Sequence, residues 1–180
     1  MRKQKIWGVV VGICGLSLAP SLLRAQDHAA AHWGYKGEDD PKHWGKLDRA
    51  YASCANGHNQ SPINITGAKP AELPALKFDY NAVPLNIIDN GHTVMVTYAP
   101  GSTLTVGDHV YKLTQFHFHH PSEERVNGKK YVMVAHLVHA DADGHLAVVA
   151  ILFKEGAANP LLETLWKDVP AEKEKAATLS

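Results

Sequence analysis

The sequence predicts a mainly β protein of the α+β class, with a few short helices around its strands. From Leu85 onward, short apolar runs rich in β-branched residues alternate with polar turns, which is typical of strands. Apolar residues fall at helical spacing in one short segment, just after Asn159. The chain has 180 residues, 45% apolar and 20% charged, so one globular domain is expected.

The charge balance argues against a polyanionic partner. Eighteen Lys and Arg residues balance 18 Asp and Glu residues, and no basic run occurs after the first five positions. Nucleic-acid-binding and membrane-surface proteins instead carry a basic patch or stripe. We therefore expect a small-molecule partner, no nucleic acid, and no membrane contact once the N-terminal segment is removed. The oligomeric state stays open, a homodimer included.

Residues 1–25 resemble a signal peptide. Basic residues at positions 2, 3 and 5 precede an apolar run over 6–18, and Ala25 provides a small residue at a cleavage point. The run is shorter than the ~20 residues that a membrane span needs. We expect cleavage, a periplasmic or secreted location, and a mature domain over 26–180. Cys54 is then the lone cysteine of the mature chain: free and buried, bonded to another chain, or paired beyond this sequence.

The segment over 27–82 is rich in Gly, Pro and Asn and predicts loops and short strands. Two strands, Leu85–Asp89 and Thr93–Tyr98, then flank Asn90-Gly91, a dipeptide favoured in tight hairpin turns. The pattern therefore predicts a β-hairpin in which His92 begins the returning strand.

Three further strands are expected at 109–119, 131–139 and 146–154. The third is almost wholly apolar, which predicts a central strand covered on both faces. Asn159 and Pro160 then provide an N-cap and a first-turn proline for a short helix. No element is predicted after Pro170.

Three histidines form a candidate metal site. Alternation along a strand places Gln115, His117 and His119 on one face, while Phe116 and Phe118 lie on the other. Imidazoles two residues apart can bind one ion, and His136 from a neighbouring strand would leave one tetrahedral position for water, as in catalytic zinc sites. Spacing alone leaves two alternatives: a merely polar face, or His120 or His139 as a substitute ligand.

Several short motifs surround these histidines: Trp33-Gly34-Tyr35, His43-Trp44, Gln60–Ile65, Asn90-Gly91-His92, Gln115–His119, Pro121-Ser122-Glu123, Ala135–His139 and Asp143–Val148. Together they resemble the signature of the α-class carbonic anhydrases, here of the exported bacterial kind. The resemblance runs from about Trp33 to Trp166. It implies a large, mostly antiparallel twisted sheet, with zinc in a cone-shaped cleft. It also implies reversible hydration of carbon dioxide to bicarbonate and a proton, by attack of zinc-bound hydroxide on CO2.

The resemblance also implies roles for the surrounding residues. His92 matches the histidine that carries protons between the zinc water and buffer, a task suited to a group with a pKa near ~6.5. Glu123 matches a glutamate that orients the zinc hydroxide through a threonine hydroxyl. Tyr35 and Asn90 match residues of the water network, and Val138 and Val148 match the apolar wall that holds CO2. From its strand phase, Gln115 is expected to accept the ring N–H of His117.

Two departures from the family pattern stand out. Many relatives carry a glutamate two residues before the third histidine, where this chain has Val134, so His136 must find another partner. The family's later strands also supply a Leu-Thr-Thr-Pro-Pro segment and, in bacterial members, a cysteine for the position of Cys54. Neither occurs by Ser180, so the resemblance implies a truncated chain.

Two other functions compete with CO2 hydration. One is a zinc-binding protein of the same family with little or no catalysis, because the threonine segment is missing. The other is a metal-binding cupin, since His117, His119 and Glu123 have compatible spacing. The cupin's second motif needs Pro-x-Gly before its last histidine, and no such pattern precedes His136.

Overall fold

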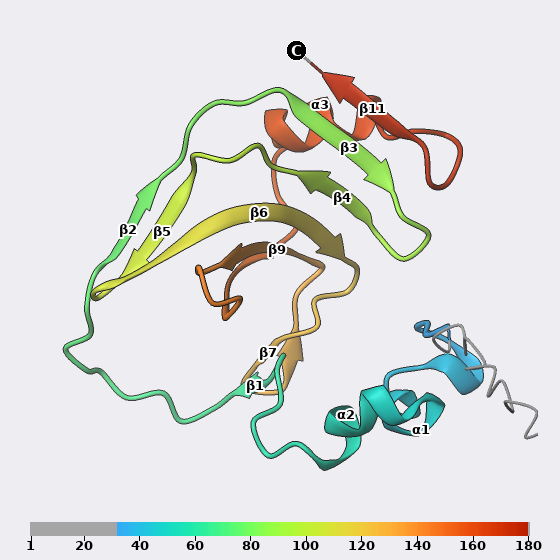
Figure 1. The fold of residues 1–180 in the computed structure, drawn as a ribbon, viewed down its shortest axis with the longest axis vertical. Helices are drawn as coiled ribbons and strands as arrows, with labels where there is room; N and C mark the ends of the chain where they lie inside the picture. The colour runs from blue at the N-terminus through green and yellow to red at the C-terminus, as the bar shows by residue number, and fades with distance from the viewer. Residues whose placement is uncertain (1–31, 180) are drawn as a thin grey trace, which may run out of the picture.

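The computed structural model describes residues 32–179, so the expected signal peptide lies outside the described part of the chain. A large sheet of eight strands dominates, in the order β10-β9-β6-β4-β3-β11, with β5 pairing β6 and β2 pairing β5 (Figure 1). Every pairing in this sheet is antiparallel. The predicted mainly β class is confirmed. The strands are β2 (Leu76–Asp79), β3 (Leu85–Asp89), β4 (Val94–Thr97), β5 (Thr103–Val106), β6 (His109–His119), β9 (Met133–Ala140), β10 (Leu146–Phe153) and β11 (Ala176–Leu179).

The smaller elements precede the sheet or connect its strands. A three-stranded sheet joins the loop before β2 to the loop between β6 and β9, in the order β1-β7-β8. None of the described helices is long and apolar enough to cross a membrane. These elements are β1 (Asn64–Ile65), β7 (Arg125–Val126), β8 (Lys129–Lys130), the 3-10 helices η1 (Gly37–Asp39) and η2 (Arg49–Tyr51), and the α-helices α1 (Trp44–Leu47), α2 (Ala52–Asn56) and α3 (Pro160–Lys167).

Strand β6 is the axis of the large sheet. It pairs with β9 on one side, while on the other its first half pairs with β5 and its second half with β4. The register shifts between Leu113 and Gln115, so Thr114 is the extra residue of a β-bulge. The Thr114 hydroxyl donates to the Val138 carbonyl oxygen at 2.9 Å, which holds the bulge against β9. Across the bulge, Leu113 and Gln115 point to opposite faces of the sheet, because they pair with the successive residues His139 and Val138.

One face of the sheet is apolar and carries the core. Ile87, Val96, Phe118 and Ala135 are buried there together with Leu165 of α3. The side chain of Asn159 accepts hydrogen bonds from the first-turn amides of α3, as its sequence predicts. The opposite face is therefore free to carry polar side chains.

The prediction that the apolar strand at 146–154 is central is wrong. β10 lies at the edge of the sheet, paired with β9 alone among the described strands. Leu146 is 66% exposed, Val148 52% and Ile151 44%. An apolar run indicates that a strand prefers burial, but it does not indicate whether other strands of the described chain lie on both sides of it.

Two further expectations need correction. His92 does not begin a strand: β3 and β4 are joined by a loop over 90–93, in which only Gly91 takes a positive φ, of 84°. Asn90 instead uses its side-chain oxygen to accept the amides of His92 and Thr93. The end of the chain is also not featureless, because β11 pairs antiparallel with β3. Four residues after a polar stretch give too little alternation to predict a strand.

The packing of α3 gives a stability prediction. Leu165 is fully buried and Leu161, on the same helix, is 60% exposed. We expect Leu165→Ala to lower the free energy of unfolding by about 2–5 kcal/mol, since it opens a cavity against the sheet. The matched control Leu161→Ala should change it by less than about 0.5 kcal/mol. Urea unfolding followed by circular dichroism measures both, and equal effects would contradict the assigned core.

Candidate metal centre

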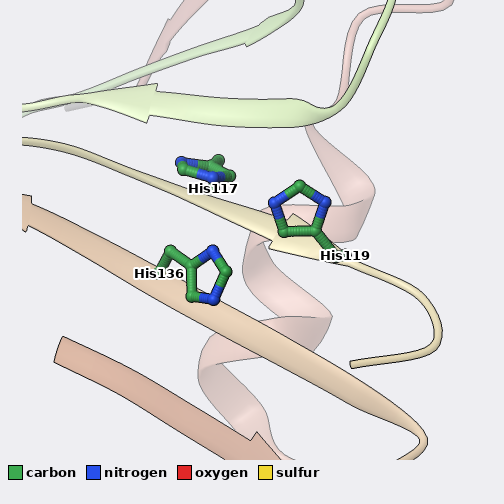
Figure 2. A group of neighbouring side chains, drawn as sticks. All are labelled: His117, His119 and His136. Atoms are coloured by element: carbon green, nitrogen blue, oxygen red, sulfur yellow. The ribbon is translucent and has the colours of Figure 1, made fainter. Parts of the chain in front are cut away.

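His117, His119 and His136 converge on one point of the polar face. β6 and β9 place His117 directly opposite His136, and His119 follows two residues later on the same face. Their ring centroids lie 4.9 to 5.3 Å apart, and one nitrogen of each ring lies within 4.8 Å of the others. Figure 2 shows the three rings clustered over these strands, with α3 behind the sheet. The donor set suits zinc, which binds imidazole nitrogen and takes three histidines in catalytic sites.

Hydrogen bonds fix the orientation of two of these rings. The Nδ1 of His117 lies 2.9 Å from the Gln115 amide oxygen, which leaves Nε2 to face the cluster. The Nε2 of His136 lies 2.6 Å from an oxygen of Glu124, which leaves Nδ1 to face it. The expected contact of Gln115 is therefore present. Glu124 was missed, because adjacent acidic residues in a loop give no periodic signal.

The two alternative histidines do not join the cluster. His139 is fully buried, and its ring lies between the Tyr80 hydroxyl at 2.7 Å and the Ala147 carbonyl oxygen at 3.2 Å. His120 lies beside the Val132 carbonyl oxygen, 2.7 Å from its Nδ1. Both rings are thus bonded away from the other three.

Glu123 brings a carboxylate to the centre of the cluster. One of its oxygens lies 3.3 Å from His119 Nε2 and 3.8 Å from His136 Nδ1. The resemblance implies that Glu123 accepts a hydrogen bond from a threonine hydroxyl. Among the described residues its ion-pair contacts are these histidines instead. Its assigned role stays a prediction.

Burial favours the neutral form of two of these histidines, His117 and His119. It lowers the pKa of His119 to about 4, with the neighbouring rings of His117 and His136 adding to the shift and Glu124 opposing it. The pKa of His117 is also lowered, first by burial and then by His136. Burial raises the pKa of Glu123. A neutral imidazole offers a lone pair to a cation, so the environment favours the ligand form.

An apolar cleft of about 380 Å³ opens beside the cluster. Tyr35 packs edge-on against His119, with ring centroids 5.8 Å apart. Burial, followed by the charge of Glu123, raises the Tyr35 pKa to about 12, so its hydroxyl keeps its proton at neutral pH. The cleft suits a small apolar molecule. Its lining residues are Trp33, Tyr35, Trp44, Tyr51, Cys54, Pro62, His117, His119 and Glu123.

The loop of His92 lies at the cleft's aromatic rim. The ring of His92 stacks on Trp33, with centroids 3.9 Å apart and an interplanar angle of 13°. Asn90 shapes this loop through its side-chain oxygen. Thr93, which the sequence did not single out, accepts the amide of Phe118 through its hydroxyl oxygen at 3.2 Å. Thr93 thus ties the loop to β6 between His117 and His119.

The remaining expected residues are also placed. Val138 and Val148 pair across β9 and β10, and Val138 shares its face with Gln115, as register dictates. Cys54 is free and exposed, which excludes the first of its three alternatives, a free and buried thiol, and leaves the other two as predictions. It lies in α2, a short helix with no buried residue.

Three imidazoles that converge on one face of a sheet, beside an apolar cleft, form a group that could hold a metal ion, with the donor set of catalytic zinc sites. The sequence pattern of the family described as eukaryotic-type carbonic anhydrase matches residues 39–180. The chain belongs to this family, the α-class carbonic anhydrases.

Similarity to individual proteins agrees with this assignment. A carbonic anhydrase of Pectobacterium carotovorum is 46% identical over 147 residues, which are 82% of this chain and 60% of that protein. A hyperthermostable carbonic anhydrase from a hydrothermal vent chimney is 47% identical, with a TM-score of 0.79 over 82% of this chain and 66% of its own. The Thermovibrio ammonificans α-carbonic anhydrase solved with sulfanilamide is 41% identical, with a TM-score of 0.80 over 83% of this chain and 67% of its own. The chain spans about three fifths of the curated relatives it matches.

The lowered pKa values give a prediction for the zinc-free chain. The pKa of His119 is about 4 when folded, whereas an unfolded histidine titrates near ~6.5. The unfolded chain therefore binds more protons between these values, so stability is full above pH ~6.5 and falls as the pH drops towards 4. NMR titration of the His119 ring in the presence of a chelator should give a midpoint well below that in urea. Equal midpoints would contradict the assigned burial.

Proposed function

We propose that this chain holds one zinc ion on His117, His119 and His136 and catalyses the reversible hydration of carbon dioxide to bicarbonate and a proton. The observation that carries the proposal is the convergence of three imidazoles beside an apolar cleft, in a chain of the carbonic anhydrase family. CO2 is small and apolar, which fits that lining.

When bound, zinc supplies Lewis acidity that makes water a nucleophile at neutral pH, for which carbonic anhydrase is a standard example. The chain's own residues do the rest. Gln115 holds His117 with its Nε2 towards the cluster. Val138 and Val148, which pair across β9 and β10 on the face that carries Gln115, are proposed to form the apolar wall for CO2.

The proton produced must leave the cleft, and His92 is the residue proposed to carry it. It lies half-buried and stacked on Trp33, a residue that lines the cleft, which supports a route for protons through its ring. Tyr35 keeps its hydroxyl proton and can organise water on this path, with Asn90 fixing the loop. Glu123 is proposed to orient the attacking oxygen.

We also propose export to the periplasm or the cell exterior. The support is the pattern of residues 1–25, which is that of a cleavable signal peptide. The mature domain would then begin at about residue 26.

One observation favours the alternative of zinc binding without turnover. Within residues 32–179, the ion-pair contacts of the Glu123 carboxylate are with His119 and His136. If those contacts persist with zinc present, Glu123 cannot orient the attacking oxygen, and the site would bind metal with little catalysis.

Zinc content and CO2 hydration, measured on one preparation, test the proposal. We expect one zinc per chain and a hydration rate that sulfanilamide inhibits. His117→Ala should lose both zinc and activity, whereas His120→Ala, whose ring bonds to Val132 away from the cluster, should keep both. One zinc per chain without inhibitable activity would support the alternative, and absence of zinc would contradict both.

Replacing His92 tests proton transfer separately. His92→Ala should keep its zinc but lose about 10²-fold in turnover in dilute buffer, because acid–base groups typically contribute at least this much. Concentrated imidazole buffer should restore the rate. An unchanged rate in dilute buffer would show that protons leave by another route.

A further inference from the structure

His136 has no hydrogen-bond acceptor on its own strand. A zinc-binding histidine almost always donates its second ring N–H to a carboxylate, carbonyl or water, which fixes the ring and raises its basicity. For His117 the partner is Gln115, two residues earlier on the same face. The corresponding position before His136 is Val134, which is fully buried and apolar. The partner of His136 must therefore come from another element.

That element is the loop between β6 and β7. Glu124 Oε1 lies 2.6 Å from His136 Nε2, and the two side chains are only 13% and 7% exposed. This short, charge-assisted bond places the ring proton on Nε2 and turns the Nδ1 lone pair towards His117 and His119. We propose that Glu124 is the positioning residue for His136, supplying from a loop the acceptor that the strand lacks. This inference rests on the proposed zinc site.

Hydrogen bonds on both sides of Glu124 fix the backbone of this loop. The buried hydroxyl of Ser122 donates to the Glu124 carbonyl oxygen at 2.8 Å and accepts the Tyr131 amide at 2.8 Å. On the other side, the Arg125 amide donates to the Ile63 carbonyl oxygen at 3.1 Å, where β7 begins. The backbone is thus fixed on both sides of Glu124.

The second carboxylate oxygen of Glu124 indicates a functional constraint. Oε2 is buried and has no hydrogen-bond partner among the described residues. Leaving a buried acceptor unpaired opposes folding, and such groups in a native protein call for an explanation. The bond of Oε1 to a metal ligand provides one, because an apolar residue here would leave His136 Nε2–H unpaired.

Zinc affinity measured by chelator competition tests the proposal without relying on turnover. Glu124→Ala should weaken binding about 10- to 100-fold, the usual effect of losing such a partner. Glu124→Gln keeps an oxygen acceptor without the charge and should lose less. The matched control Glu155→Ala removes an exposed glutamate and should bind zinc like the unmodified chain. Cobalt(II) absorption of each variant reports the ligand geometry.

A rescue variant separates positioning from general loss of structure. Position 134 shares its strand face with His136, so Val134→Glu can offer a carboxylate as Gln115 offers its amide. Glu124→Ala combined with Val134→Glu should recover zinc affinity and the cobalt spectrum, and it serves as the test should Glu124→Ala alone not fold. Affinity of Glu124→Ala within twofold of the unmodified chain, or no recovery in the folded double variant, would overturn the proposal. Failure of the unmodified chain to bind zinc would instead contradict the proposed function.

Discussion

The pairing of β6 with β9 is the constraint on which the rest of the molecule depends. It sets His117 opposite His136 and, by the same alternation, sends Phe116 and Phe118 to the face covered by α3. The core and the candidate metal site therefore lie on opposite faces of the same pair of strands. A substitution that disturbs packing on the core face would also shift the histidines on the opposite face, because both sets of side chains belong to the same two strands.

The site also balances opposing electrostatic demands. Burial favours the neutral, cation-binding form of His117 and His119, yet it makes placing two carboxylates beside them costly. Glu123 and Glu124 occupy different sides of the cluster. Glu123 lies on the cleft side, and Glu124 lies behind the ring of His136. A divalent cation held by the histidines would offset negative charge on these carboxylates.

Features that follow a local sequence period could be predicted from the sequence. Features that depend on contacts with distant parts of the chain could not. The bounds of β6 and β3 and the cap at Asn159 follow from alternation and local hydrogen bonding. The edge position of β10 depends on which strands lie beside it, and β11 is too short to show a period. Glu124 was missed for a similar reason, since its importance comes from a ring 12 residues away on another strand.

The bulge at Thr114 divides β6 into two parts with different tolerance to changes in chain length. A strand that gains one residue turns every later side chain to the other face, unless the extra residue is looped out. The bulge already accommodates such a residue before Gln115, so the hairpin with β5 can vary in length without reorienting the histidines. The segment from Gln115 to His119 has no bulge that could take up an extra residue. An insertion there would turn His119 towards α3.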